Sequence, residues 1–164
     1  MKIRPIRAIA IFVFLIGVTN FSLAVHRAYV RTGHKQTGVQ IAQLNLCLQQ
    51  YIEDHGGTLP VAANSAAIVA KLAPYHVSAA EYRAYYDTNV EIKFNCAISG
   101  LNAHKIASPG SAVTFYESQP DFEGKRWVTY LGIPASPPPS SDMADQYGRL
   151  INEQQWRALQ KTIR

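Results

Sequence analysis

The sequence has no acidic residue before Glu53, although six Lys and Arg residues precede that position. Beyond Lys35, the remaining ten Lys and Arg residues face eleven Asp and Glu residues, so the excess positive charge belongs to the N-terminal part of the chain. A nucleic-acid-binding protein needs a basic stripe on its folded body to contact phosphates. The charge distribution therefore argues against DNA or RNA as a partner.

The chain also lacks the short motifs that mark common catalytic and cofactor sites. It contains no Gly-x-Ser-x-Gly elbow, phosphate loop or dinucleotide fingerprint, and its five His residues are scattered. The cluster Glu53-Asp54-His55 is more typical of a solvated helix end than of a metal site. A calcium ion could be reached by Glu117, Asp121 and Glu123. A short acidic loop is, however, also common in β-hairpins as an ordinary surface feature. We predict no catalytic residue, no cofactor and no metal ligand, and thus a protein that is not an enzyme.

Cysteine is scarce, with Cys47 and Cys96 the only two in the chain. One falls in a helical pattern and the other in a strand pattern, each on an apolar face. In an exported protein they could form a disulfide that fixes the helix to the sheet. The alternative is a pair of buried free thiols, which pack as small apolar side chains. The sequence leaves both alternatives open.

Charge is absent from the 18 residues between Ala8 and Val25, and basic residues flank this apolar run on both sides. As a helix the run would extend about 27 Å, enough to cross a bilayer core once. It also fits a signal peptide that is cleaved after Ala24, at the small-x-small pattern Ser22-Leu23-Ala24. Both interpretations place the rest of the chain outside the cytoplasm.

From Thr37 onward the pattern is that of an amphipathic helix. Apolar residues recur at steps of three and four and form one stripe, made by Ile41, Leu44, Cys47, Leu48, Tyr51 and Ile52. Gly56 and Gly57 supply the left-handed conformation that ends a helix, and Pro60 prevents its resumption. No proline separates this helix from the apolar run, although Gly33 and Gly38 predict a soft junction between them.

The remaining sequence predicts short helices, a small sheet and a closing helix. Asn64 caps a first helix that ends at Pro74, and Ser78 with Glu81 suggests a capping box in a second. Tyr82 and Tyr86 then share a face and are expected to pack around the sheet. Three segments have strand patterns joined by short loops, which favours an antiparallel meander; they are 91–98, 112–118 and 126–132.

The end of the chain predicts two further features. The proline-rich segment 133–142 is predicted to form an irregular loop on the surface. Asn152 and Gln155 predict a capped C-terminal helix, with Trp156, Leu159 and Ile163 as its apolar stripe. Trp127 and Trp156 are expected to anchor the sheet and this helix.

The order of these elements resembles that of type IV pilin-like proteins, including the pseudopilins of type II secretion. The likeness is carried by "QLNLCLQQYIEDHGGTLP", "FNCAISG", "AVTFYESQPDFEGKRWVTYL" and "GRLINEQQWRAL". The resemblance implies an α+β fold, in which a long N-terminal helix packs on a small antiparallel β-sheet with short helices and a C-terminal helix. Residues 1–35 would form the basic flank and transmembrane segment, and residues 36–164 an extracytoplasmic pilin-like domain.

The resemblance also implies a function and a location. The chain would be a structural component of a secretion or pilus-type assembly, held by a single helix in a bacterial inner membrane. Its partners would be membrane lipid and other pilin-like subunits. The alternative is a secreted, non-catalytic binding domain released by signal-peptide cleavage.

Overall fold

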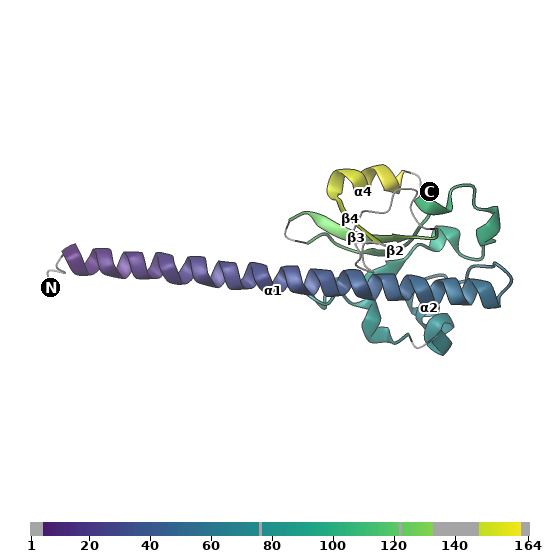
Figure 1. Cartoon of the computed structure of the whole chain (residues 1–164), viewed down its shortest axis with the longest axis horizontal. Coiled ribbons are helices and arrows are strands. Elements are labelled where there is room, and N and C mark those ends of the chain that lie inside the picture. The colour runs from purple at the N-terminus through teal and green to yellow at the C-terminus, as the bar shows by residue number, and fades with distance from the viewer. Residues whose placement is uncertain (1–4, 76, 122, 133–147, 162–164) are drawn as a thin grey trace.

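Helix α1 (Pro5–Asp54) runs for 50 residues and carries the rest of the chain around its C-terminal half. The computed structural model describes residues 5–75, 77–121, 123–132 and 148–161, and side-chain exposure from Phe14 onward. Figure 1 shows the N-terminal half of α1 projecting well beyond the other elements. We call these other elements, which pack around the C-terminal half of α1, the head. The prediction that the apolar run and the amphipathic helix form one rod is confirmed.

The two glycines near the middle of α1 do not make a soft junction, because each lies where the head approaches the helix most closely. A Cβ atom on Gly33 would lie 2.8 Å from the Cβ of Tyr86. A Cβ atom on Gly38 would lie 2.6 Å from Cζ2 of Trp127. These glycines therefore permit close packing within a continuous helix, and the expected weak point is absent from this part of the chain.

The helix ends as the sequence predicts. Gly56 adopts a left-handed conformation with φ of 62°, and the N–H of Gly57 donates to the carbonyl of Ile52 over 2.8 Å. The N–H of Gly56 donates to the carbonyl of Glu53, which completes a Schellman motif and satisfies carbonyls that the helix leaves unpaired.

The head is built on an antiparallel sheet with the strand order β1-β2-β3-β4. Its strands are β1 (Ile92–Phe94), β2 (Val113–Glu117), β3 (Lys125–Tyr130) and β4 (Gly148–Asn152). The predicted meander is confirmed for β2 and β3, whereas β1 is shorter than expected and β4 was not predicted. The pairing of Trp127 with Leu150 lies at the centre of the β3–β4 register.

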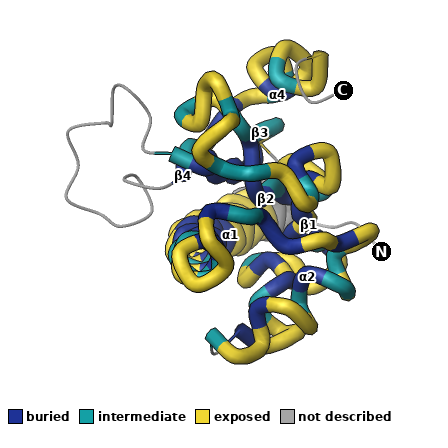
Figure 2. The backbone as a smooth tube through the Cα atoms, turned by 90° about the vertical axis from the view of Figure 1, so that its right-hand side faces the viewer, coloured by how far each residue is buried: buried dark blue, intermediate teal, exposed yellow. Residues whose placement is uncertain are grey.

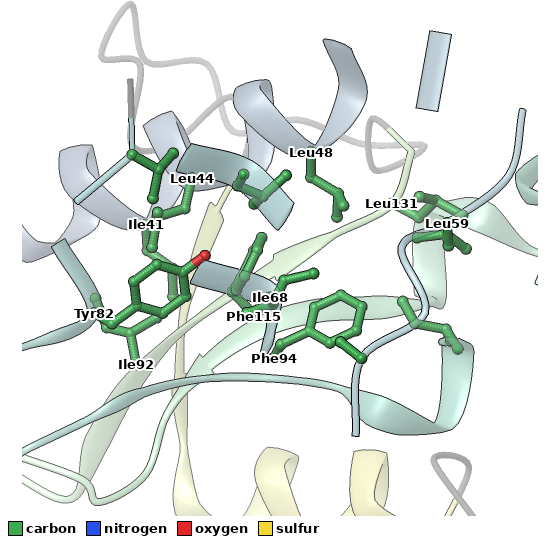
Figure 3. Packing of buried hydrophobic residues seen from close by; sticks show 14 of the residues in the cluster. Ile41, Leu44, Leu48, Leu59, Ile68, Tyr82, Ile92, Phe94, Phe115 and Leu131 are labelled. Carbon is green, nitrogen blue, oxygen red and sulfur yellow. The ribbon is translucent and has the colours of Figure 1, made fainter. Parts of the chain in front are cut away.

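Helices cover both faces of the sheet (Figure 2). On one face, α1 and α2 (Ser65–Leu72) pack on the larger core, in which Ile41, Leu44 and Leu48 are fully buried against Phe115 (Figure 3). On the other face, α4 (Glu153–Gln160) places Trp156 in a smaller core. The predicted Asn152–Gln155 capping box begins α4. The proline-rich segment and Ile163 lie outside the described residues.

Short turns of 3-10 helix lie in the connections from α2 to β1 and from β1 to β2. They are η1 (Ala73–Tyr75), η2 (Ala79–Tyr82), η3 (Cys96–Ile98), η4 (Ala103–Lys105) and η5 (Pro109–Ser111). The predicted strand 91–98 was therefore too long, because Asn95 accepts a bond from the Ala97 N–H and turns the chain into η3. The capping box at Ser78 was also wrong, since its hydroxyl donates to the Glu81 carboxylate instead of capping a backbone N–H.

The segment after α1 pairs with the segment around η3 and η4. The Leu59 N–H donates to the carbonyl of Leu101 over 2.9 Å, and the Ala103 N–H donates to the carbonyl of Gly57 over 2.7 Å. The hydroxyl of Ser99 accepts from the Ala62 N–H. Two of the sequence segments behind the pilin resemblance thus lie side by side, although almost 40 residues separate Pro60 from Ser99.

Candidate interaction surface

The projecting half of α1 exposes large apolar side chains that no described part of the head covers. Phe14, Phe21 and Tyr29 are 70%, 72% and 64% exposed. Leu15, Ile16, Val18, Leu23 and Val25 are also exposed. From Phe14 onward, the first buried residue of the helix is Val30, so in this part of α1 packing against the head begins there.

These side chains do not form a single stripe. Successive residues of an α-helix point about 100° apart, so Phe14, Leu15 and Ile16 face three different directions. A helix that is apolar on several sides belongs inside a larger protein assembly or in a membrane, rather than on a water-facing surface. We call residues 14–25 the apolar segment.

A basic region, which we call the neck, follows the apolar segment and consists of His26, Arg27, Arg31 and Lys35. All four side chains are exposed. Arg31 lies 3.7 Å from Glu123 in the loop between β2 and β3. A hydrogen bond from Lys125 lowers the pKa of Glu123, and Arg31 lowers it further.

Beneath the neck, His34 joins α1 to the β2–β3 hairpin through a buried polar cluster. Its Nε2 lies 3.5 Å from Glu117 Oε2 and its Nδ1 lies 3.6 Å from Asp121 Oδ2. Trp127 on β3 bonds to both β2 and α1. Its backbone N–H donates to Glu117 over 2.7 Å, and its indole N–H donates to the His34 carbonyl over 2.8 Å. Burial, followed by the charge of Glu117, raises the pKa of Tyr86, whose ring packs against His34.

The acids suggested as calcium ligands are therefore occupied within the fold. Glu117 is fully buried in β2, while Asp121 accepts bonds from the Glu123 and Lys125 backbone N–H groups. Among the described residues, no group of three His, Cys, Asp or Glu side chains is placed to hold a metal ion. His34 was not among the predicted site residues, although it lies seven residues before Ile41 and thus on the buried stripe.

Both cysteines are free in the structure. Cys47 is half-buried on α1, where its thiol contacts the carbonyl of Tyr75 at 3.3 Å, and burial raises its pKa. Cys96 is exposed at the start of η3, with its sulfur 3.7 Å from the carbonyl of Phe94. The expectation that Cys96 lies on the apolar face of a strand was wrong, because the strand ends at Phe94.

The cluster Glu53-Asp54-His55 is an aromatic–polar surface at the far end of α1. The His55 ring stacks on Tyr51 with centroids 3.8 Å apart. The Tyr75 hydroxyl donates to Asp54 over 2.8 Å. Partial desolvation, followed by this bond to Asp54, raises the pKa of Tyr75. These contacts tie the turn after α2 to the end of α1.

A groove of about 530 Å³ runs between α2, η2 and the outer edge of β1. Its lining includes Val69, Phe94 and Cys96, together with Arg83 and Glu91, which pair with each other at 3.3 Å. Tyr82 also lines it, but this side chain is 5% exposed and packs edge-on against Phe115 in the core. The groove is open to the surface and is lined by both apolar and charged side chains.

Comparison with known proteins identifies no relative: no family model, curated protein or solved structure matches the chain. Within the residues whose side chains the structure describes, no helix reaches the combined length and hydropathy of a membrane-spanning segment.

Proposed function

We propose that this protein is a membrane-anchored, pilin- or pseudopilin-like structural component of a secretion or pilus-type assembly. Its N-terminal helix would cross a bacterial inner membrane once and hold the head outside the cytoplasm. The observation that carries the proposal is the apolar segment, which is exposed on several sides and stands clear of the head.

Large apolar side chains on several faces of a projecting helix are unfavourable in water but favourable in lipid. The segment from Phe14 to Val25 would extend about 18 Å along the helix axis. A complete crossing therefore also needs residues 8–13, which are apolar in the sequence.

The pilin-like part of the proposal is supported by the resemblance in sequence and by the arrangement of the head. One stripe of α1 is buried in the head while the helix continues beyond it as a stalk. Such a shape positions a folded body above a membrane and leaves the stalk for lipid and for other pilin-like subunits. The proposed work is mechanical and needs no catalytic group.

Membrane insertion can be tested with the full chain expressed in a Gram-negative bacterium. The protein should remain in the membrane pellet after alkaline carbonate extraction, because an inserted helix is not released by loss of ionic contacts. Deletion of residues 1–25 should release a folded head into the soluble fraction. Extraction of the full chain by carbonate would contradict the anchor.

The side of the membrane can be tested with the exposed Cys96. In a Cys47→Ser variant, a membrane-impermeant maleimide should label Cys96 in intact spheroplasts. A Cys47→Ser/Cys96→Ser variant provides the matched control. Labelling that requires permeabilised membranes would place the head in the cytoplasm and overturn the proposal.

A second candidate is the secreted binding domain cleaved after Ala24. It is favoured by one observation: packing against the head begins at Val30, so cleavage would leave the described core intact. The groove beside β1 would then be its binding surface. Intact mass separates the candidates, because loss of residues 1–24 together with a soluble product supports secretion, whereas the full-length mass in the membrane supports the anchor.

A further inference from the structure

The three strongest cations of the neck share one side of α1. Arg27, Arg31 and Lys35 follow one another at intervals of four residues, which places them within an arc of about 80°. The same spacing spreads them over about 12 Å along the helix axis. Arg27 and Lys35 make no ion pair within the described part of the chain.

The acids near the neck do not neutralise it. Glu123 is shared between Arg31 at 3.7 Å and Lys125 at 3.0 Å. Asp121 is only 5% exposed and faces His34 and backbone N–H groups instead of the neck cations. The helix itself contributes no acid until Glu53. A net positive surface thus remains where the head begins.

This surface directly follows the apolar segment, since only His26 separates Val25 from Arg27. We infer that the neck binds the phosphate groups of anionic phospholipids at the outer surface of the membrane. The inference rests on the proposed membrane anchor and names the lipid class that the anchor selects. Arg27 lies nearest to the bilayer, whereas Lys35 acts from farther out, within about one or two Debye lengths.

The geometry favours lipid over another polyanion. The three cations lie along α1 beside the head, which packs on this helix from Val30 onward, so a rigid duplex has little room to follow them. A lipid headgroup is small and sits beside the helix as soon as the apolar segment is inserted. Each Lys or Arg near an anionic surface strengthens binding by roughly fivefold.

The test uses the full chain reconstituted in vesicles that contain spin-labelled phosphatidylglycerol or spin-labelled phosphatidylcholine. Electron spin resonance separates the motionally restricted lipid that touches the helix from bulk lipid. We expect phosphatidylglycerol to be enriched at the helix about fivefold or more over phosphatidylcholine. The enrichment should decrease in 1 M salt, where screening is strong.

The decisive variant is Arg27→Gln/Arg31→Gln/Lys35→Gln, which should lose most of this enrichment. The matched control, Lys71→Gln/Lys105→Gln/Lys161→Gln, removes three exposed head cations and should keep it. Lys2, Arg4 and Arg7 remain in both variants, so the difference between them measures the neck alone. Equal enrichment in the two variants would overturn the inference. Absence of any restricted lipid would instead contradict the membrane anchor itself.

Discussion

The indole ring of Trp127 lies directly over Gly38, so that a Cβ atom on this glycine would come within 2.6 Å of the ring. The same indole donates to the His34 carbonyl four residues earlier. Trp127 therefore holds one turn of α1 by contact and hydrogen bond together, at the point where the stalk enters the head. The glycine is required by this approach, not by a turn of the backbone.

Gly38→Ala should consequently destabilise the head. Alanine favours the helix by about 1 kcal/mol, but the added methyl group must displace a buried ring, which costs about 1–3 kcal/mol. We expect the free energy of unfolding to fall by about 1 kcal/mol, measured by Trp fluorescence during urea unfolding in mild detergent. Gly17→Ala is the control, because nothing lies within 4 Å of that position and head stability should not change. A Gly38→Ala protein as stable as wild type would show that the ring moves freely.

A second prediction concerns the polar bridge between α1 and the sheet. Asn45 donates to the Tyr130 carbonyl over 3.0 Å and accepts from the Thr114 hydroxyl over 2.7 Å. Because Thr114 donates there, Thr129 must donate in the 2.8 Å bond between the two hydroxyls. Asn45→Leu leaves the Tyr130 carbonyl and the Thr114 hydroxyl buried without this hydrogen-bond partner. It should lower the free energy of unfolding by about 2–4 kcal/mol.

A double-mutant cycle separates this bridge from simple packing. Combined with Thr114→Val, Asn45→Leu should show a coupling energy of about 1 kcal/mol or more. Thr32→Val is the control, since the Thr32 hydroxyl bonds only to the Ala28 carbonyl at an exposed site on the same helix. Additive effects of Asn45→Leu and Thr114→Val would count against the bridge.

The local signals in the sequence predicted much of this fold. The stripe from Ile41 to Ile52, the glycine stop at Gly56 and the Asn152 cap are set by neighbouring residues, and each is confirmed. Strand β4 was missed because Gly148 and Asn152 have low strand propensity and only pairing with β3 makes them a strand.

The polar cluster could not be predicted, because its members come together only in three dimensions. His34 and Glu117 are far apart in the sequence, and the ring that covers Gly38 comes from β3. The apolar run from Ala8 to Val25, by contrast, was evident because 18 uncharged residues need no tertiary contact to be recognised.

A third prediction concerns the end of α1. Gly56 has a φ of 62° and open space around it, so only its backbone conformation resists substitution. Gly56→Ala should lower the free energy of unfolding by about 1–2 kcal/mol. Gly56→Asn should lower it less, because asparagine tolerates the left-handed conformation. Equal losses in urea unfolding would indicate a steric conflict that the structure does not contain.

The last prediction uses Tyr82, whose buried hydroxyl has no hydrogen-bond partner among the residues that the structure describes. Burial raises the pKa of this phenol, and the neighbouring Cys47 and Glu81 raise it further. The folded state therefore keeps the Tyr82 proton at a pH where an unfolded tyrosine, with a pKa near 10, loses it. The unfolded state binds fewer protons in that range, so the free energy of unfolding must fall as the pH rises above about 10.

In Tyr82→Phe the phenol proton that only the folded state retains above pH 10 is absent, so this residue no longer contributes to the pH dependence of stability. At neutral pH its stability should equal or exceed that of wild type by up to about 1 kcal/mol, since an unsatisfied hydroxyl is lost. Above pH 10 the free energy of unfolding of the variant should fall less steeply than that of wild type. The two slopes should differ by up to about 1.4 kcal/mol per pH unit. Burial also raises the pKa of Tyr86 and Tyr130, so part of the slope should remain. Urea unfolding at pH 8 and at steps from pH 10 to 11.5 measures both effects, and a neutral-pH loss of several kcal/mol would reveal a hydrogen bond to this hydroxyl.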